Sequence, residues 1–413
     1  MSRTGIRRLT SDLCRCDVAT APIGCIARIV DNWTLRVLCM SSVLTIAVGV
    51  AQDVERGRSF DPQTAAQRDG ERHLVVSSVG LSSATFNPSD RGTLRLLYRL
   101  ARDSAVTVNV YGPDNGLVRT LVQGVRRNMG SNQELWDGKD LAGKIVPNEA
   151  YFFNIETVDS SVITEVYDPT TFSGGEFGEI TRGEVSRGGG TVSYQLSQPS
   201  RVLLRAGIAG SAMLKTIVDW EPRPAGAVTE YWNGKDEDNL IDLLGRKYTM
   251  ILSYMTLPET SVITYGNINY TYREYRALVK RKPEIKSDRG MTNNRKLSPH
   301  FLKSPLTDRS FKVKLGFSTL DRPGAKDVPE ARDRVVLRLD IDPKDREVIE
   351  NQQFEIILFV DTVFYIEEER GYLPFNIPIE LKDLPPGEHV ITANVITFGD
   401  QIGVGSRKVR VVK

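Results

Sequence analysis

The chain has few of the residues that usually carry chemistry or covalent cross-links. Its four cysteines (Cys14, Cys16, Cys25 and Cys39) all lie within the first 39 residues, and only three of its 413 residues are histidine. The rest of the chain can form no disulfide, so its stability must come from hydrophobic cores. The formal net charge is only +2, which does not favour nucleic-acid binding.

The patterns of common catalytic sites are also missing. His73, His300 and His389 are far apart in the chain, and no G-x-S-x-G turn is present. Two acidic runs, 236–242 and 340–345, offer oxygen ligands, but neither has the glycine and terminal glutamate of a calcium loop. We therefore predict no catalytic residue, no cofactor and no metal site. The alternative is an enzyme whose site follows no familiar pattern.

The most extended apolar run, VLCMSSVLTIAVGVA, lies at residues 37–51. It follows two arginines and ends in the small residues Gly49 and Ala51, directly before a polar stretch. This combination is typical of a signal peptide, and we predict a leader over 1–51 that is cleaved after Ala51. The alternative is an uncleaved anchor, although a spanning helix needs about 20 apolar residues. In both cases we expect an exported protein, periplasmic or on the cell surface.

What the sequence does contain is an internal repeat. The segment YRLARDSAV from Tyr98 matches YQLSQPSRV from Tyr194, and WDGKD from Trp136 matches WNGKD from Trp232. Both pairs are separated by the same 96 positions, from 98 to 194 and from 136 to 232. A repeat of this size matches one immunoglobulin-like sandwich of about 100 residues.

Hydrophobic residues within each copy alternate with polar ones. Leu94, Leu96, Tyr98 and Leu100 are separated by polar residues or by one leucine, and valines recur at every second position from 106 to 110. A period of two is typical of a strand with one buried face. No stretch of 12 residues in either copy has a convincing helical period, so we predict an all-β protein.

The motifs of the first copy resemble a known family. Phe86-Asn87-Pro88, the strand around Tyr98, the NGLVRTL hairpin, WDGKD and the late Tyr151 resemble the immunoglobulin-like (FlgD-like) domain of the flagellar hook-capping protein. The resemblance covers residues 86–159 and, more loosely, 188–256. It implies an immunoglobulin-like sandwich that serves as a non-catalytic module in an exported bacterial protein, without implying a flagellar role.

The two copies depart from that family at one place. The family commonly has a glycine two residues before the late tyrosine. Here Glu149 stands at that position in the first copy and Arg246 in the second, with Gly245 one place early. We expect the hairpin before this strand to differ in shape from that of the family.

We expect a tyrosine and tryptophan core in each copy. A tryptophan can close one end of a sandwich, and the Asp/Asn-Gly that follows it suits a tight turn with positive φ. The alternative is that both tryptophans are exposed and stack on a ligand such as a sugar. The predicted core positions are Tyr98, Trp136, Gly138, Tyr151, Tyr194, Trp232, Gly234 and Tyr248.

A basic segment over residues 268–309 follows the second copy. It has eleven Lys or Arg residues and four acidic residues. One interpretation is a solvated linker. The other is a docking strip for an acidic partner or for anionic lipid headgroups on a membrane surface, with tyrosines providing contact area. The candidate contact residues are Tyr272, Tyr275, Lys280, Arg281 and Lys282.

Strand patterns return in the last hundred residues, for example in FEIILFV at 354–360, and predict a third sandwich. The predicted organisation is then a leader at 1–51, a linker at 52–80, sandwiches at 81–160, 188–267 and 310–413, and linkers at 161–187 and 268–309.

Tandem sandwiches without a catalytic pattern indicate a non-catalytic structural or interaction protein. We expect an accessory scaffold whose partners are proteins of an envelope or membrane complex. The alternative is a carbohydrate-binding protein.

Overall fold

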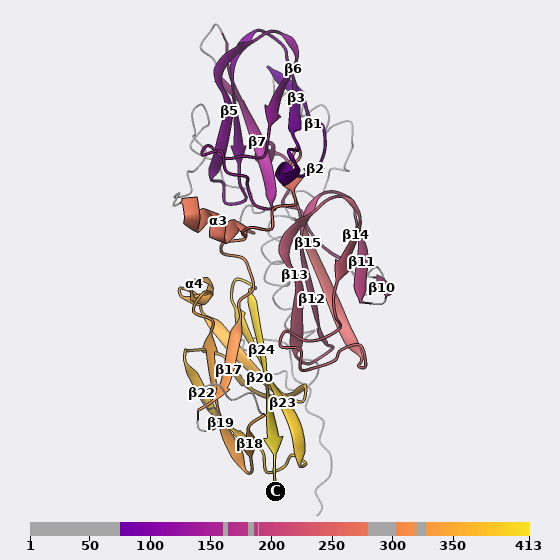
Figure 1. Cartoon of the computed structure of the whole chain (residues 1–413), viewed down its shortest axis with the longest axis vertical. Helices are drawn as coiled ribbons and strands as arrows, with labels where there is room; N and C mark the ends of the chain where they lie inside the picture. The colour runs from indigo at the N-terminus through magenta and orange to yellow at the C-terminus, as the bar shows by residue number, and fades with distance from the viewer. Residues whose placement is uncertain are drawn as a thin grey trace, which may run out of the picture.

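The computed structural model describes residues 75–159, 164–180, 186–188, 190–279, 303–318, 320 and 328–413. These residues form three β-sandwiches, coloured from indigo through magenta to yellow along the chain in Figure 1. The two α-helices among them, α3 (Tyr272–Val279) and α4 (Arg346–Ile349), are short. This confirms the predicted all-β class. In the described part of the chain, no helix is long and apolar enough to cross a membrane, and the predicted leader at 1–51 lies outside it.

The first sandwich, domain 1, packs a three-stranded sheet against a larger one. The small sheet has the order β1 (Val76–Leu81), β3 (Leu94–Leu100), β6 (Gly130–Trp136). The large sheet has the order β2 (Thr85–Phe86), β16 (Val262–Thr264), β7 (Ala150–Val158), β4 (Ser104–Tyr111), β5 (Leu117–Arg127), with β8 (Thr164–Tyr167) also paired to β7.

Trp136 lies at the centre of the domain 1 core. Its side chain is 1% exposed, and its ring makes edge contacts with the rings of Phe86, Tyr151 and Phe153 at centroid distances of 5.3 to 5.8 Å. The indole N–H donates to the Lys139 carbonyl oxygen at 3.0 Å, so its polar atom is satisfied inside the core. The alternative of an exposed, ligand-stacking tryptophan is excluded at this position.

The second sandwich, domain 2, repeats this arrangement. Its small sheet has the order β10 (Ser186–Gly188), β11 (Thr191–Leu196), β14 (Gly226–Tyr231), and its large sheet β13 (Met213–Arg223), β12 (Ser200–Ile208), β15 (Tyr248–Thr256), β9 (Phe177–Ile180). Trp232 is buried, contacts Tyr248 at 5.6 Å and donates its N–H to the Lys235 carbonyl oxygen. Gly138 and Gly234, the glycines after the two tryptophans, have φ of 69° and 75°, a region that disfavours side chains.

Both copies also contain a polar triad that the sequence comparison did not reveal. In domain 1 the Tyr98 hydroxyl donates to Glu134 at 3.0 Å, and Arg127 donates to both oxygens of the same carboxylate at 2.9 and 3.0 Å. Burial and the adjacent carboxylate raise the pKa of Tyr98, so its hydroxyl keeps its proton. The same triad recurs 96 positions later in Tyr194, Glu230 and Arg223.

The third sandwich, domain 3, has its own core. Its smaller sheet has the order β17 (Val313–Phe317), β19 (Arg334–Ile341), β22 (Phe375–Glu380). Its larger sheet has the order β18 (Glu330–Ala331), β24 (Ile402–Val411), β23 (Gly387–Thr397), β20 (Phe354–Val360), β21 (Val363–Glu368). The apolar run FEIILFV forms β20, which is paired on both sides.

The chain crosses the predicted domain boundaries at several places. β1 begins inside the expected 52–80 linker and pairs with β3 of domain 1. Two strands lie inside the expected 161–187 linker: β8 pairs with β7 of domain 1, and β9 pairs with β15 of domain 2. β16, expected in the second sandwich, pairs instead with β7 and β2 of domain 1. Local composition predicted these boundaries incorrectly because backbone pairing to distant strands decides where such short segments belong.

We predict that Trp136→Ala lowers the free energy of unfolding by about 3–5 kcal/mol, because it opens a cavity in the domain 1 core. The matched control is Tyr231→Ala in domain 2, whose side chain is 86% exposed and whose loss should cost less than about 0.5 kcal/mol. Chemical denaturation followed by tryptophan fluorescence and circular dichroism measures both. Equal costs would contradict the assignment of Trp136 as a core anchor.

Candidate functional site: the interfaces between the domains

Helix α3, within the expected basic linker, packs on domain 1. Tyr272 and Tyr275 are buried in its hydrophobic cluster, and Tyr275 is only 1% exposed. This corrects the hypothesis that these two tyrosines contact an external partner. Lys280, Arg281 and Lys282, the other candidate contact residues, lie outside the described residues.

The buried face of α3 is fixed by hydrogen bonds to two turns of domain 1. The Tyr275 hydroxyl donates at 2.8 Å to Asp140, the last residue of WDGKD. The Tyr272 hydroxyl donates at 2.6 Å to Asp114 of the PDNG turn, and Arg276 forms an ion pair with the same carboxylate at 2.9 Å. Both tyrosine side chains can be buried because their hydroxyl groups have hydrogen-bond partners inside the protein.

A buried ion pair joins domain 1 to domain 2. Arg201 of β12 lies 2.8 Å from the Glu149 carboxylate, and each side chain is 5% exposed. Arg201 also donates to the Trp220 carbonyl oxygen at 3.0 Å, and the Ala150 amide donates to Glu149 at 2.7 Å. Burial raises the pKa of Glu149, and the Arg201 guanidinium opposes this shift. The pair has the dense hydrogen bonding that a buried charge needs.

Glu149 stands where the family that the first copy resembles commonly has glycine, and here its carboxylate contacts the neighbouring domain. A glycine there would have no carboxylate to meet Arg201, so the glutamate belongs to the contact between the two copies. β16 strengthens the same junction, since Val262–Thr264 follows domain 2 in the chain but pairs with β7 and β2 of domain 1. The Thr264 hydroxyl donates to the Pro147 carbonyl oxygen at 2.7 Å.

Domain 3 packs on domain 2 through one face of its larger sheet. Ile357 and Phe359 of β20 are 7% and 3% exposed and belong to the hydrophobic cluster of domain 2. The Asn394 side chain accepts from the Met213 amide at 2.9 Å and donates to the Met213 carbonyl oxygen at 2.7 Å. An amide that satisfies both backbone groups of one residue fixes the position of one sheet on the other.

Helix α3 also contacts domain 3. Arg273, on its exposed side, lies 2.7 Å from Glu347 of α4 and 3.4 Å from Asp345. Arg309, just before domain 3, forms a second pair with Asp345 at 2.7 Å. Figure 1 shows α3 between the first and third sandwiches, above α4. The described beginning of the expected linker is therefore a bridge between domains.

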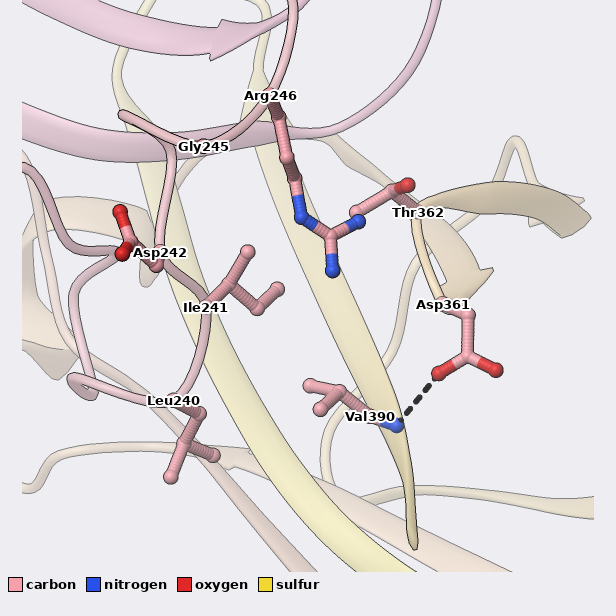
Figure 2. A pocket seen from close by; sticks show the side chains of 8 residues that line it. All are labelled: Leu240, Ile241, Asp242, Gly245, Arg246, Asp361, Thr362 and Val390. Atoms are coloured by element: carbon pink, nitrogen blue, oxygen red, sulfur yellow. Dashed lines mark hydrogen bonds between the residues drawn. The ribbon is translucent and has the colours of Figure 1, made fainter. Parts of the chain in front are cut away.

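A pocket of about 280 Å³ lies between domains 2 and 3 (Figure 2). Arg246, the second departure from the family's glycine, extends its guanidinium into this space toward Thr362. Among the described residues there is no group of three His, Cys, Asp or Glu side chains suited to a metal. The lining residues are Leu240, Ile241, Asp242, Gly245, Arg246, Asp361, Thr362 and Val390.

His389 supports the domain 3 wall of this pocket. Its Nδ1 lies 2.6 Å from the Asp361 carboxylate and its Nε2 lies 2.8 Å from the Pro385 carbonyl oxygen. Both partners can only accept, so the protonated imidazolium satisfies both contacts. Burial lowers the pKa of His389, but the hydrogen bonds to Asp361 and Pro385 outweigh this effect and raise it.

Comparisons with known proteins give similarity at the level of β-domains. No family model and no curated protein matches the chain. No family is shown. The solved structure of the hook-capping protein FLGD from P. aeruginosa is 25% identical, covering 22% of this chain and 66% of that chain at a TM-score of 0.18.

Two further solved structures cover more of the chain at lower identity. Fibronectin(III)-like modules of Clostridium thermocellum CbhA are 8% identical over 81% of this chain and 94% of that chain, at a TM-score of 0.17. A tetra-tandem repeat of a large adhesion protein is 9% identical, covering 82% of this chain and 75% of that chain at a TM-score of 0.16. At these TM-scores the matches carry no argument about function.

We predict that either single change, Arg201→Met or Glu149→Leu, destabilises the protein by about 3–5 kcal/mol because it leaves an unpaired buried charge. The double variant should cost much less than the sum, which chemical denaturation in a double-mutant cycle measures. Arg126→Met is the control, since Arg126 is 81% exposed and 3.8 Å from Asp103. Additive costs would contradict coupling across this junction.

We predict that the His389–Asp361 contact makes domain 3 less stable at alkaline pH. Because the folded pKa lies above the unfolded value of 6.5, the stabilisation is complete below that value and is lost as pH rises through the folded pKa. Thermal melting from about pH 6 to about pH 9 should show this decline, and His389→Gln should reduce it. Identical pH profiles for both proteins would contradict the prediction.

Proposed function

We propose that this chain is a non-catalytic, exported scaffold, an accessory subunit that holds protein partners in a membrane-associated or cell-envelope complex. The main support is the way the three sandwiches are joined. The junctions of domain 2 with domain 1 and with domain 3 contain buried contacts, of which the Glu149–Arg201 pair is the clearest. Such contacts favour a fixed spacing between binding surfaces over independent modules on flexible linkers.

The absence of an enzymatic role is part of this proposal. It is supported by the missing catalytic patterns in the sequence: no G-x-S-x-G turn is present, and the three histidines are far apart in the chain. Export is supported by the apolar run at 37–51 with its basic flank and small-residue exit.

The carbohydrate-binding alternative loses its two principal residues. Trp136 and Trp232, which would have stacked on sugar rings, are buried in their domain cores. Stacking on a glycan requires an exposed aromatic face, so this alternative would depend on other aromatic side chains.

Affinity purification of the tagged full chain from native membranes in mild detergent tests the proposal. The expected result is recovery of a defined complex of envelope or membrane proteins, with a tagged exported protein of similar size as the control. A monomer that captures nothing would contradict the scaffold role. Binding on a glycan array would instead support the carbohydrate-binding alternative.

A further inference from the structure

The outward face of the small sheet in domain 1 has an unusual composition. Along β3 the outward residues are Arg95, Leu97 and Arg99, and the opposite positions on β6 are Leu135, Gln133 and Ser131. Leu97 is 42% exposed and Leu135 is 61% exposed. In these six residues, here called the domain 1 outer face, Leu97 lies between Arg95 and Arg99 on β3, and Leu135 lies opposite Arg95 on β6.

The charge of this face is uncompensated among the described residues. None of its six residues is acidic, and neither Arg95 nor Arg99 has a side-chain hydrogen bond or ion pair with a described residue. Arg127, by contrast, is paired with Glu134 on the inner side of the same sheet. A guanidinium has five donors in a planar fork, which match a carboxylate especially well.

The side toward β1 leaves Leu97 open. Its partner on β1 is Gly80, and a side chain built there would meet nothing within 4 Å. A leucine beside a glycine on a sheet face loses the cross-strand packing that would otherwise cover it. The apolar centre of the face is therefore available to a partner.

The second copy provides an internal comparison. β11 and β14 pair in the same register 96 positions later, with Ser193 opposite Thr229 where the first copy has Leu97 opposite Gln133. The outward residues there are Thr191, Ser193, Gln195, Ala227, Thr229 and Tyr231, and none is charged. Since the same fold forms with those residues, the sandwich does not require arginines and leucines on the domain 1 outer face.

We propose that the domain 1 outer face binds a protein partner whose matching surface has Asp or Glu carboxylates around an apolar centre. Leu97 and Leu135 supply the apolar area of the contact, and Arg95 and Arg99, on either side of Leu97, pair with carboxylates of the partner. Arginine is enriched among residues that dominate interface energies, and paired charges fix orientation. This inference rests on the proposed scaffold function and names the surface through which it acts.

The first test is site-specific photo-cross-linking of the full chain in native cells. p-Benzoylphenylalanine replaces Gln133 on the domain 1 outer face or, as the matched control, Thr229 at the equivalent position of domain 2. The expected result is a cross-link from position 133 to a protein segment rich in Asp and Glu, with none from position 229. Equal cross-links from both positions, or cross-links to phospholipid or to a second copy of this chain, would overturn the inference.

The second test replaces residues of the domain 1 outer face with the residues at the equivalent positions of domain 2. The triple variant Arg95→Thr/Leu97→Ser/Arg99→Gln should reduce recovery of the cross-linked partner by about tenfold or more while leaving the melting temperature close to that of the unchanged protein. Leu135→Tyr is a second variant, with the residue that domain 2 carries there. Retained recovery with both variants would overturn the inference.

The two proposals fail in different ways. If affinity purification of the unchanged chain recovers no partner, the scaffold function itself is wrong. If it recovers a partner and the triple variant recovers it equally well, the scaffold function stands and only the assignment to the domain 1 outer face is wrong.

Discussion

The buried pair of Glu149 and Arg201 is the contact on which the arrangement of the first two domains depends. Neither charge is stable in that environment without the other, because removing a charged group from water is costly unless it is paired and hydrogen-bonded. The pair forms only when β12 of domain 2 lies against the start of β7 in domain 1. It therefore specifies one orientation of the two sandwiches, whatever its net contribution to stability.

The path of the chain adds to this constraint. After completing domain 2, the chain returns to domain 1 through β16 and α3 before it enters domain 3. The described part of this connection, through residue 279, is held on domain 1 by strand pairing and by the packing of a helix. Arg273 then connects the exposed side of α3 to α4, and Asn394 fixes the sheet of domain 3 to Met213 of domain 2. Each domain thus contacts both of the others.

Much of the architecture could be predicted from the sequence because its determinants are local. Alternation within strands predicted the sandwiches, and the 96-residue spacing predicted two copies that share even the register of β3–β6 and β11–β14. The role of α3 could not be predicted in this way. Tyr272 and Tyr275 lie in a polar, basic segment, and their burial depends on Asp114 and Asp140, which are more than 130 positions away.

One signal for the interfaces was nevertheless present in the sequence. The two positions that depart from the family's glycine, Glu149 and Arg246, both lie where one domain meets the next. From the charged residue in place of a turn glycine, the sequence predicted a change in the shape of the hairpin, and neither the contact nor its partner. Only the three-dimensional arrangement identifies Arg201 for the first and the pocket with Asp361 for the second.

The central claim is that contacts at the domain junctions hold the three sandwiches at a fixed spacing, and a distance measured between domains 1 and 3 tests it most directly. Native cysteines occur only at positions 14, 16, 25 and 39. When these are replaced with serine, spin labels attach only to two introduced cysteines, Gln133→Cys in domain 1 and Glu369→Cys in domain 3. Pulsed electron paramagnetic resonance should then give a single narrow distance distribution. A broad distance distribution in the protein with native Arg201, and an equally broad one after Arg201→Met, would contradict the account.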